Sequence, residues 1–165
     1  MGTGYSFKCK KCQYEYNVSL GIGFMYPDVY QTKLKEISSG EYGIERKKLF
    51  ETTPYAAINA EQVLYICGSC HTWEEGTDVT LYAPNNPENI AKKQYGVKTV
   101  EEWGTVPYVM KWDLDEDYHV VMRYYHKCPK CGKRMHKASE YEGSILCCPK
   151  CGTPNEDSGL GINWD

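Results

Sequence analysis

The sequence lacks long apolar runs and an excess of positive charge. No stretch of its 165 residues approaches the roughly 20 apolar residues of a membrane-spanning helix, and no basic patch precedes an apolar stretch of signal-peptide length. The formal net charge of -3 argues against loose electrostatic binding to DNA or RNA, because such binding needs Lys and Arg to neutralise phosphates. We therefore expect a cytoplasmic protein without a membrane partner.

Phenylalanine is scarce, and cysteine is too rare for a disulfide scaffold. Phe occurs 3 times, whereas Tyr occurs 15 times and Trp 4 times, a balance that suits small sheets with half-exposed aromatic faces. Nine cysteines make up about 5% of the chain, below the level of disulfide-rich secreted domains, and a reducing compartment keeps them as thiols. The core is predicted to be thin, and metal binding is the natural use of the thiols.

Eight of the nine cysteines form four C-x-x-C pairs. The pentapeptide CPKCG occurs at 128–132 and again at 148–152, which assigns Cys148 rather than Cys147 as the partner of Cys151. A C-x-x-C turn directs two sulfur atoms at one ion, so two facing turns make a tetrahedral four-thiolate site. The sequence therefore predicts two metal sites per chain, with Cys9, Cys12, Cys67, Cys70, Cys128, Cys131, Cys148 and Cys151 as ligands.

The spacing of the pairs favours one assignment of the two sites. Sixteen residues separate Cys131 from Cys148, which is within the range of a four-cysteine zinc module, so the last two pairs are predicted to share an ion. This leaves the first two pairs for each other, and closing the long loop between them costs only about 1 kcal/mol more. Crossed pairing between the two halves is the alternative. The first two pairs also lack the glycine of CPKCG, since Gln13 and His71 stand there.

Four stretches resemble known metal-binding families. CPKCGKRM and CPKCGTPN resemble the zinc-ribbon family, while YSFKCKKCQYEYN and YICGSCHTWEE are similar to the turns of rubredoxin-like folds. The resemblance implies the eight ligands above and two Zn²⁺ per chain, with iron as an alternative at the N-terminal site because rubredoxin-type sites hold iron. It implies no single function, since zinc ribbons serve many processes.

Periodicity predicts an α+β fold, with the small antiparallel sheets of two zinc ribbons and a helical insertion between the first two C-x-x-C pairs. Alternating apolar residues predict strands around the pairs, including a long strand from Tyr118 toward Cys128. Helices are predicted from an N-cap at Asp28 to Gly40, over 42–52, and after caps at Asn86 and Thr99, although Asn-Pro clusters such as that after Asn86 are also common in loops. The predicted divisions are an N-terminal module (1–117), a C-terminal ribbon (118–153) and a frayed tail (154–165).

Other candidate sites are weaker. Asp113, Asp115 and Asp117 alternate as in an EF-hand loop, but Tyr118 occupies the position of the required Gly, so a solvated acidic turn is expected. His71 and His126 adjoin predicted ligands and are expected to act as hydrogen-bonding neighbours or surface residues. Cys147 is interpreted as a small apolar side chain, with redox exchange into a metal site as the alternative.

The leading functional hypothesis is a non-enzymatic zinc protein with two structural sites, which serves as a regulatory or protein-interaction module for an unknown protein partner. No His is paired with a Ser or Cys nucleophile in any recognisable pattern, so an enzyme is not expected. An iron electron carrier is one alternative. A nucleic-acid-binding protein is the other, with candidate contacts at Arg123, Lys127, Lys130, Lys133, Arg134 and Lys137.

Overall fold

The chain passes repeatedly between two structural units. The computed structural model describes residues 2–139, 142–143, 145–155 and 160–164. Unit 1 comprises Met1–Phe24, Glu61–Thr77 and Tyr125–Asp165, and unit 2 comprises Met25–Ala60 and Asp78–Tyr124. The units therefore do not follow the predicted division into residues 1–117 and 118–153, because the N-terminal, middle and C-terminal segments fold together in unit 1.

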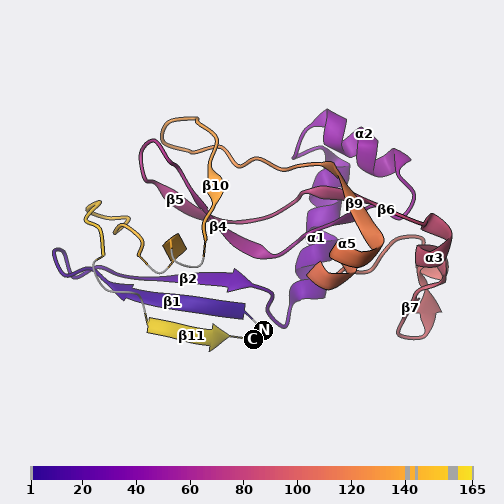
Figure 1. Cartoon of the computed structure of the whole chain (residues 1–165), viewed down its shortest axis with the longest axis horizontal. Helices are drawn as coiled ribbons and strands as arrows, with labels where there is room; N and C mark the ends of the chain where they lie inside the picture. Colours follow the sequence, from indigo (N-terminus) through magenta and orange to yellow (C-terminus); the bar gives the residue numbers. More distant parts are fainter. Residues whose placement is uncertain (1, 140–141, 144, 156–159, 165) are drawn as a thin grey trace. The chain divides into compact units, whose positions relative to one another are not determined.

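Unit 1 is built on an antiparallel sheet whose strands come from all three of its segments. The order is β10-β4-β2-β1-β11, with β5 paired to β4 (Figure 1). The predicted frayed tail is wrong for part of its length, since β11 pairs with β1 and places Trp164 opposite Gly2. The strands are β1 (Gly2–Lys8), β2 (Glu15–Gly21), β4 (Gln62–Ile66), β5 (Trp73–Thr77), β10 (His136–Lys137) and β11 (Leu160–Trp164).

The core of unit 1 is small and is built around an aromatic pair. Phe7 and Tyr16 come from neighbouring strands, and their rings stack with centroids 4.9 Å apart. The hydroxyl of Tyr16 donates to the carbonyl of Leu146 at 3.1 Å, which attaches the C-terminal segment to the sheet. Two cysteines are part of this cluster, whose buried members are Phe7, Cys9, Tyr16, Val18, Leu64, Leu146 and Cys148.

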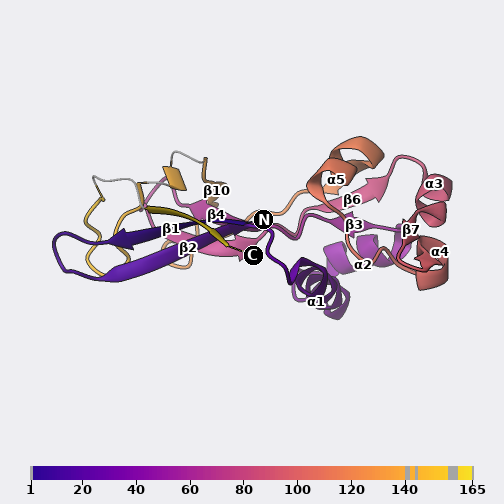
Figure 2. The same ribbon diagram turned by 90° about the horizontal axis from the view of Figure 1, so that it is seen from below.

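Unit 2 contains the helices and two small sheets, one of order β3-β6-β9 and one of β7-β8. Figure 2 shows α5 on one side of the β3-β6-β9 sheet and α1 and α2 on the other. The predicted helical insertion is confirmed, since α1 and α2 lie between Cys12 and Cys67. The elements are α1 (Tyr26–Ser39), α2 (Ile44–Thr52), β3 (Ala57–Ile58), β6 (Leu81–Pro84), α3 (Pro87–Lys92), β7 (Gln94–Tyr95), β8 (Lys98–Thr99), α4 (Val100–Trp103), α5 (Lys111–Asp117) and β9 (Tyr118–Met122).

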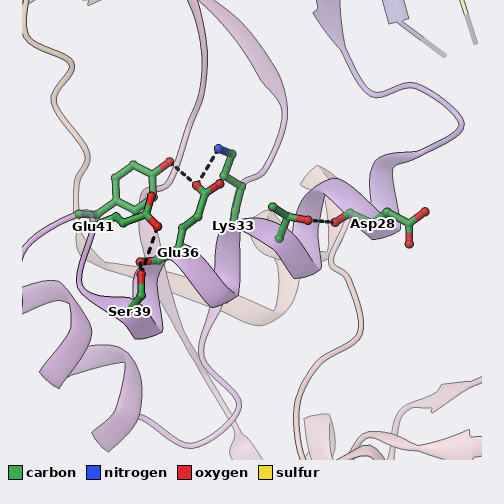
Figure 3. Close-up of polar contacts among 7 residues, drawn as sticks. Asp28, Lys33, Glu36, Ser39 and Glu41 are labelled. Atoms are coloured by element: carbon green, nitrogen blue, oxygen red, sulfur yellow. Dashed lines mark hydrogen bonds and ion pairs between the residues drawn. The ribbon is translucent and has the colours of Figure 1, made fainter.

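Helix α1 ends where expected but begins earlier than predicted. Its N-cap is Met25, so Asp28 lies in the first turn, where its negative charge interacts favourably with the positive end of the helix dipole. At the other end, Gly40 has a φ of 94°, the left-handed conformation that glycine adopts without steric cost. The following turn is held by Glu36, which accepts hydrogen bonds from Lys33 at 2.7 Å and from Tyr42 at 2.9 Å (Figure 3).

The sequence signals for the later helices are mostly confirmed. The Asn86 side chain caps α3, and Thr99 with Glu102 forms a capping box at the start of α4. The strand that begins at Tyr118 is shorter than predicted: β9 ends at Met122 and does not continue toward Cys128.

The alternating aspartates all lie in helix α5, so the solvated turn expected from the sequence is wrong, although the rejection of a calcium loop holds. Lys93 reaches Asp113 at 3.0 Å and Asp117 at 2.6 Å, while Lys111 reaches Asp115 at 2.7 Å. The acidic segment is therefore charge-paired within unit 2. No helix in the described part of the chain is both long and apolar enough to cross a membrane.

Arg46 fastens α2 to the sheet of unit 2, and its loss should destabilise this unit. The buried guanidinium donates to the carbonyls of Val79 at 2.6 Å, Arg123 at 3.1 Å and Met122 at 3.5 Å. Arg46→Met would leave these carbonyls without that donor, so we expect the free energy of unfolding to fall by about 3 kcal/mol in urea titrations followed by circular dichroism.

Two further variants control for charge and helix propensity. Arg46→Lys should recover only part of the loss, because an ammonium group cannot reproduce the planar fork of donors. The exposed Lys48→Met on the same helix should change stability by less than about 0.5 kcal/mol. Equal stability of Arg46→Met and Lys48→Met would contradict the assigned role.

Candidate metal centres

The four C-x-x-C turns, here called knuckles, share one backbone conformation. In each, the backbone N–H of the first cysteine donates to the carbonyl of the residue five positions later. The carbonyl of the same cysteine accepts from the N–H of the residue four positions later, and all these distances are 2.8–2.9 Å. The residue after the second cysteine has a positive φ in every knuckle, at 58° in Gln13, 56° in His71, 69° in Gly132 and 71° in Gly152. The first two knuckles therefore adopt the left-handed conformation that favours glycine, although they have Gln13 and His71 at this position.

The knuckles meet in two groups of four sulfur atoms. Site A comprises Cys9, Cys12, Cys148 and Cys151, and site B comprises Cys67, Cys70, Cys128 and Cys131. In each site all four sulfur atoms lie within 4.8 Å of one another, and the closest pairs are 3.5 Å apart. A tetrahedron of metal–sulfur bonds of about 2.3 Å has sulfur atoms about 3.8 Å apart, whereas a disulfide needs about 2.05 Å. Both groups are therefore positioned to bind one metal ion each.

The eight predicted ligands gather in two four-cysteine groups, but the pairing predicted from spacing is wrong, and the knuckles pair across the two halves, as in the alternative. Neither half of the chain makes its own site: each site joins one β-hairpin knuckle to one CPKCG knuckle. Strand pairing explains site B, because β10 follows knuckle 128–131 and places His136 opposite Ile66 beside knuckle 67–70. Site A is brought together by the aromatic core, where Leu146 and Cys148 pack with Phe7 and Cys9.

Burial divides the ligands of each site into two kinds. The first cysteine of every knuckle is at most 2% exposed, whereas the second is partly or fully accessible. Each metal would therefore be anchored from inside the unit and approached by solvent only past Cys12 and Cys151, or past Cys70 and Cys131.

Each site contains a thiol whose pKa is lowered by a neighbouring threonine. The hydroxyl and backbone N–H of Thr72 lower the pKa of Cys70 to about 6, and Thr153 lowers the pKa of Cys151 to about 6 in the same way. Hydrogen bonds to a thiolate favour the charged form, which is the form that binds a metal. The two sites thus share this feature as well as their knuckle geometry.

The histidines beside the knuckles are not metal ligands in the described part of the chain. His71 is exposed, while His126 Nε2 lies 2.7 Å from a carboxylate oxygen of Glu74 and the ring stacks on Tyr65 with centroids 4.6 Å apart. Cys147 also stays outside both sites, and its carbonyl accepts a hydrogen bond from the indole of Trp73 at 2.7 Å. Sequence reasoning missed Trp73, whose only signal was its position after a knuckle.

The candidate nucleic-acid contacts are all exposed, but they do not form one set. Arg123 belongs to unit 2, whereas the other five belong to unit 1. Among these five, Lys133 donates to Ser69 at 3.2 Å, and the Arg134 guanidinium lies over the ring of Tyr125. Lys127 forms a backbone bridge with Arg134, and Lys137 lies opposite Tyr65 in the sheet of unit 1. The fifth is Lys130.

Comparison with known proteins found no match: no family model matches the sequence, and no curated protein or solved structure is significantly similar to the chain. The metal centres accordingly rest on the geometry of the cysteines, and the likeness to zinc ribbons is a likeness of motifs.

Paired cysteine substitutions test the assignment of knuckles to sites. Cys9 and Cys148 share site A, so Cys9→Ser/Cys148→Ser should retain one metal per chain, at site B. Cys128 and Cys148 belong to different sites, so Cys128→Ser/Cys148→Ser should retain none, because each site keeps only three thiolates. Metal content after gel filtration measures both, and Cys147→Ser, which should keep two, is the control. If Cys128→Ser/Cys148→Ser retained one metal and Cys9→Ser/Cys148→Ser retained none, the pairing predicted from spacing would be correct instead.

Because the residue after the second cysteine is left-handed in every knuckle, adding a glycine at this position should stabilise the protein and removing one should destabilise it. His71→Gly should raise the free energy of unfolding by about 1 kcal/mol, since a non-glycine residue pays about that to be left-handed. Gly132→Ala should lower it by about 1 kcal/mol without a clash, because an added Cβ meets nothing within 4 Å.

Gly68 provides a matched control within knuckle 67–70. Its added Cβ also meets nothing within 4 Å, but its φ is not in the left-handed range. Gly68→Ala should therefore be no less stable than the parent protein in urea titrations of the metal-loaded protein. If Gly68→Ala and Gly132→Ala cost the same, backbone conformation is not the cause.

Proposed function

We propose that the chain is a non-enzymatic zinc protein whose two four-cysteine sites are structural. The observation that carries this proposal is that each site supplies four thiolates to one ion. A tetrahedral ion with four protein ligands has no open position for water or substrate, whereas catalytic zinc sites keep one open. The sites are thus suited to holding segments together rather than to chemistry.

The likeness of the two centres favours the same metal in both. The expectation of iron at the N-terminal site depended on a site made from the two knuckles without glycine, but each site combines one such knuckle with one CPKCG knuckle. Both centres also contain one thiol hydrogen-bonded to a threonine. The same metal is therefore expected in both, and a pair of iron centres remains the competing outcome.

The role of the protein is proposed to be regulatory or scaffolding, through a protein partner. Unit 2 supports this, since it carries large apolar side chains that are accessible to solvent: Val97 is 91% exposed, Ile44 76% and Trp112 63%. Aromatic side chains such as Trp112 are enriched in protein interfaces.

Metal removal tests the structural role directly. Protein purified without chelator should be colourless and contain two zinc ions per chain. All nine cysteines belong to unit 1, and unit 2 has its own buried residues, among them Tyr30, Ile37 and Ile58. Chelation should therefore abolish amide dispersion for residues of unit 1 in NMR spectra while helical circular dichroism from unit 2 persists, and added zinc should restore the spectrum.

Three outcomes would overturn the proposal. Visible absorption in the purified protein would indicate iron and an electron carrier. A chain with fewer than two metals would mean that the cysteine groups are not both metal sites. Full amide dispersion of unit 1 after chelation would mean that the metals do not hold it together.

A further inference from the structure

A groove within unit 1 lies between the two metal sites. Its volume is about 760 Å³, and it is lined by residues of knuckle 67–70 and of knuckle 148–151, together with Lys130 of knuckle 128–131. The side chains that could contact a ligand include Trp73, His71, Lys130, Lys150, Pro149 and Pro154. Among the described residues no Asp or Glu lines it, so the charged side chains of the groove are cationic.

Trp73 presents a fixed aromatic ring to this groove. Its indole N–H donates to the carbonyl of Cys147 at 2.7 Å, and its ring packs against Tyr16 with centroids 5.6 Å apart. Side chains held in this way lose little conformational entropy when a ligand binds. A planar, apolar group could therefore stack on this ring at small cost.

The basic residues of the knuckles exceed the negative charge of the metal centres. A divalent ion with four thiolates carries a net charge of about -2. Site A has Lys10, Lys11 and Lys150 in its knuckles, and the CPKCG knuckle of site B is followed by Lys133 and Arg134 in addition to its own Lys130. The knuckle surfaces are therefore locally positive by about one charge each, although the whole chain is acidic.

We propose that this groove binds single-stranded nucleic acid, with a base stacked on Trp73 and phosphates near Lys130 and Lys150. Trp73 is partly buried, and a partly accessible ring beside cations is what sequence-tolerant single-strand binding uses. A duplex would hide the base faces that stack. The proposal rests on the proposed function, because the two structural metals shape the groove. Arg123, in unit 2, is not part of this site.

Fluorescence anisotropy with labelled 12-nucleotide strands tests the proposal on full-length protein shown to contain two metals. Oligo(U) and oligo(dT) should both bind saturably at about 50 mM salt. An abasic strand of the same length should bind at least about fivefold more weakly, since stacking of one base supplies that factor or more. A duplex of the same length should also bind more weakly.

Charge variants locate the site. Removing two phosphate contacts should reduce the slope of log K against log salt by about 1.4 for a single strand, so Lys130→Glu/Lys150→Glu should bind more weakly and depend less on salt. Lys47→Glu/Lys48→Glu on α2 makes the same charge change in unit 2 and should bind like the parent protein. Both variants must retain two metals, which separates loss of the groove from loss of fold.

Each other outcome overturns the inference. Absence of saturable binding by the two-metal protein would exclude the site and leave the structural role of the metals standing. Equal binding of the abasic strand would mean a general polyanion surface without base stacking. Equal weakening by both charge variants would mean that net charge, and not this groove, governs binding.

Discussion

The structure of unit 1 depends on how four knuckles are joined through two four-thiolate sites. The joins are nested: site B links knuckle 67–70 to knuckle 128–131, and site A links the knuckles that flank this whole stretch. Cys12 and Cys148 are 136 positions apart, and Cys70 and Cys128 are 58 apart. Compared with a join over the short C-terminal loop, the longer closure costs about 2 kcal/mol. Zinc bound to four thiolates would contribute about 10–16 kcal/mol per site in either pairing, so it does not choose between them. A preference of about 2 kcal/mol is small, and strand pairing and core packing decide the pairing.

The nested joins also explain how a thin core can suffice. The buried cluster of unit 1 has only a few side chains, and two of them, Cys9 and Cys148, are ligands of site A. Metal binding and apolar packing therefore act on the same segments: Phe7 and Tyr16 hold the C-terminal segment near the sheet, and the ion would lock it there. Unit 2, without cysteine, depends instead on ordinary helix and sheet packing around Tyr30, Ile37 and Leu81.

The arrangement of the cysteines bears directly on the proposed function. With a metal bound, four thiolates would leave no coordination position for a substrate, so recognition would fall to the residues around the knuckles. Strand β5 begins at Trp73, three residues after Cys70, and the hydrogen bond to Cys147 ties that ring to the segment that leads into knuckle 148–151. The two proposed metal sites and the fixed position of Trp73 thus arise from one arrangement, in which each hairpin knuckle is paired with a CPKCG knuckle.

Local chemistry was readable from the sequence. The C-x-x-C spacing identified all eight cysteines of the two groups, and the caps at Asn86 and Thr99 and the stop at Gly40 were confirmed because each depends only on neighbouring residues. Signals of the same kind were less reliable at element ends, since α1 begins earlier and β9 ends sooner than predicted.

What only the tertiary structure decided was which distant segments meet. The sixteen residues between Cys131 and Cys148 favoured a local ribbon, yet the register of β10 on β4 and the packing of Leu146 on the aromatic core direct these cysteines to different sites. The pairing of β11 with β1, which replaced a predicted tail, has the same origin. Residue types determine that thiolates will gather in fours around an ion. Which four gather is set by long-range strand pairing and burial, because their combined free energy exceeds the small entropic preference for the shortest loop.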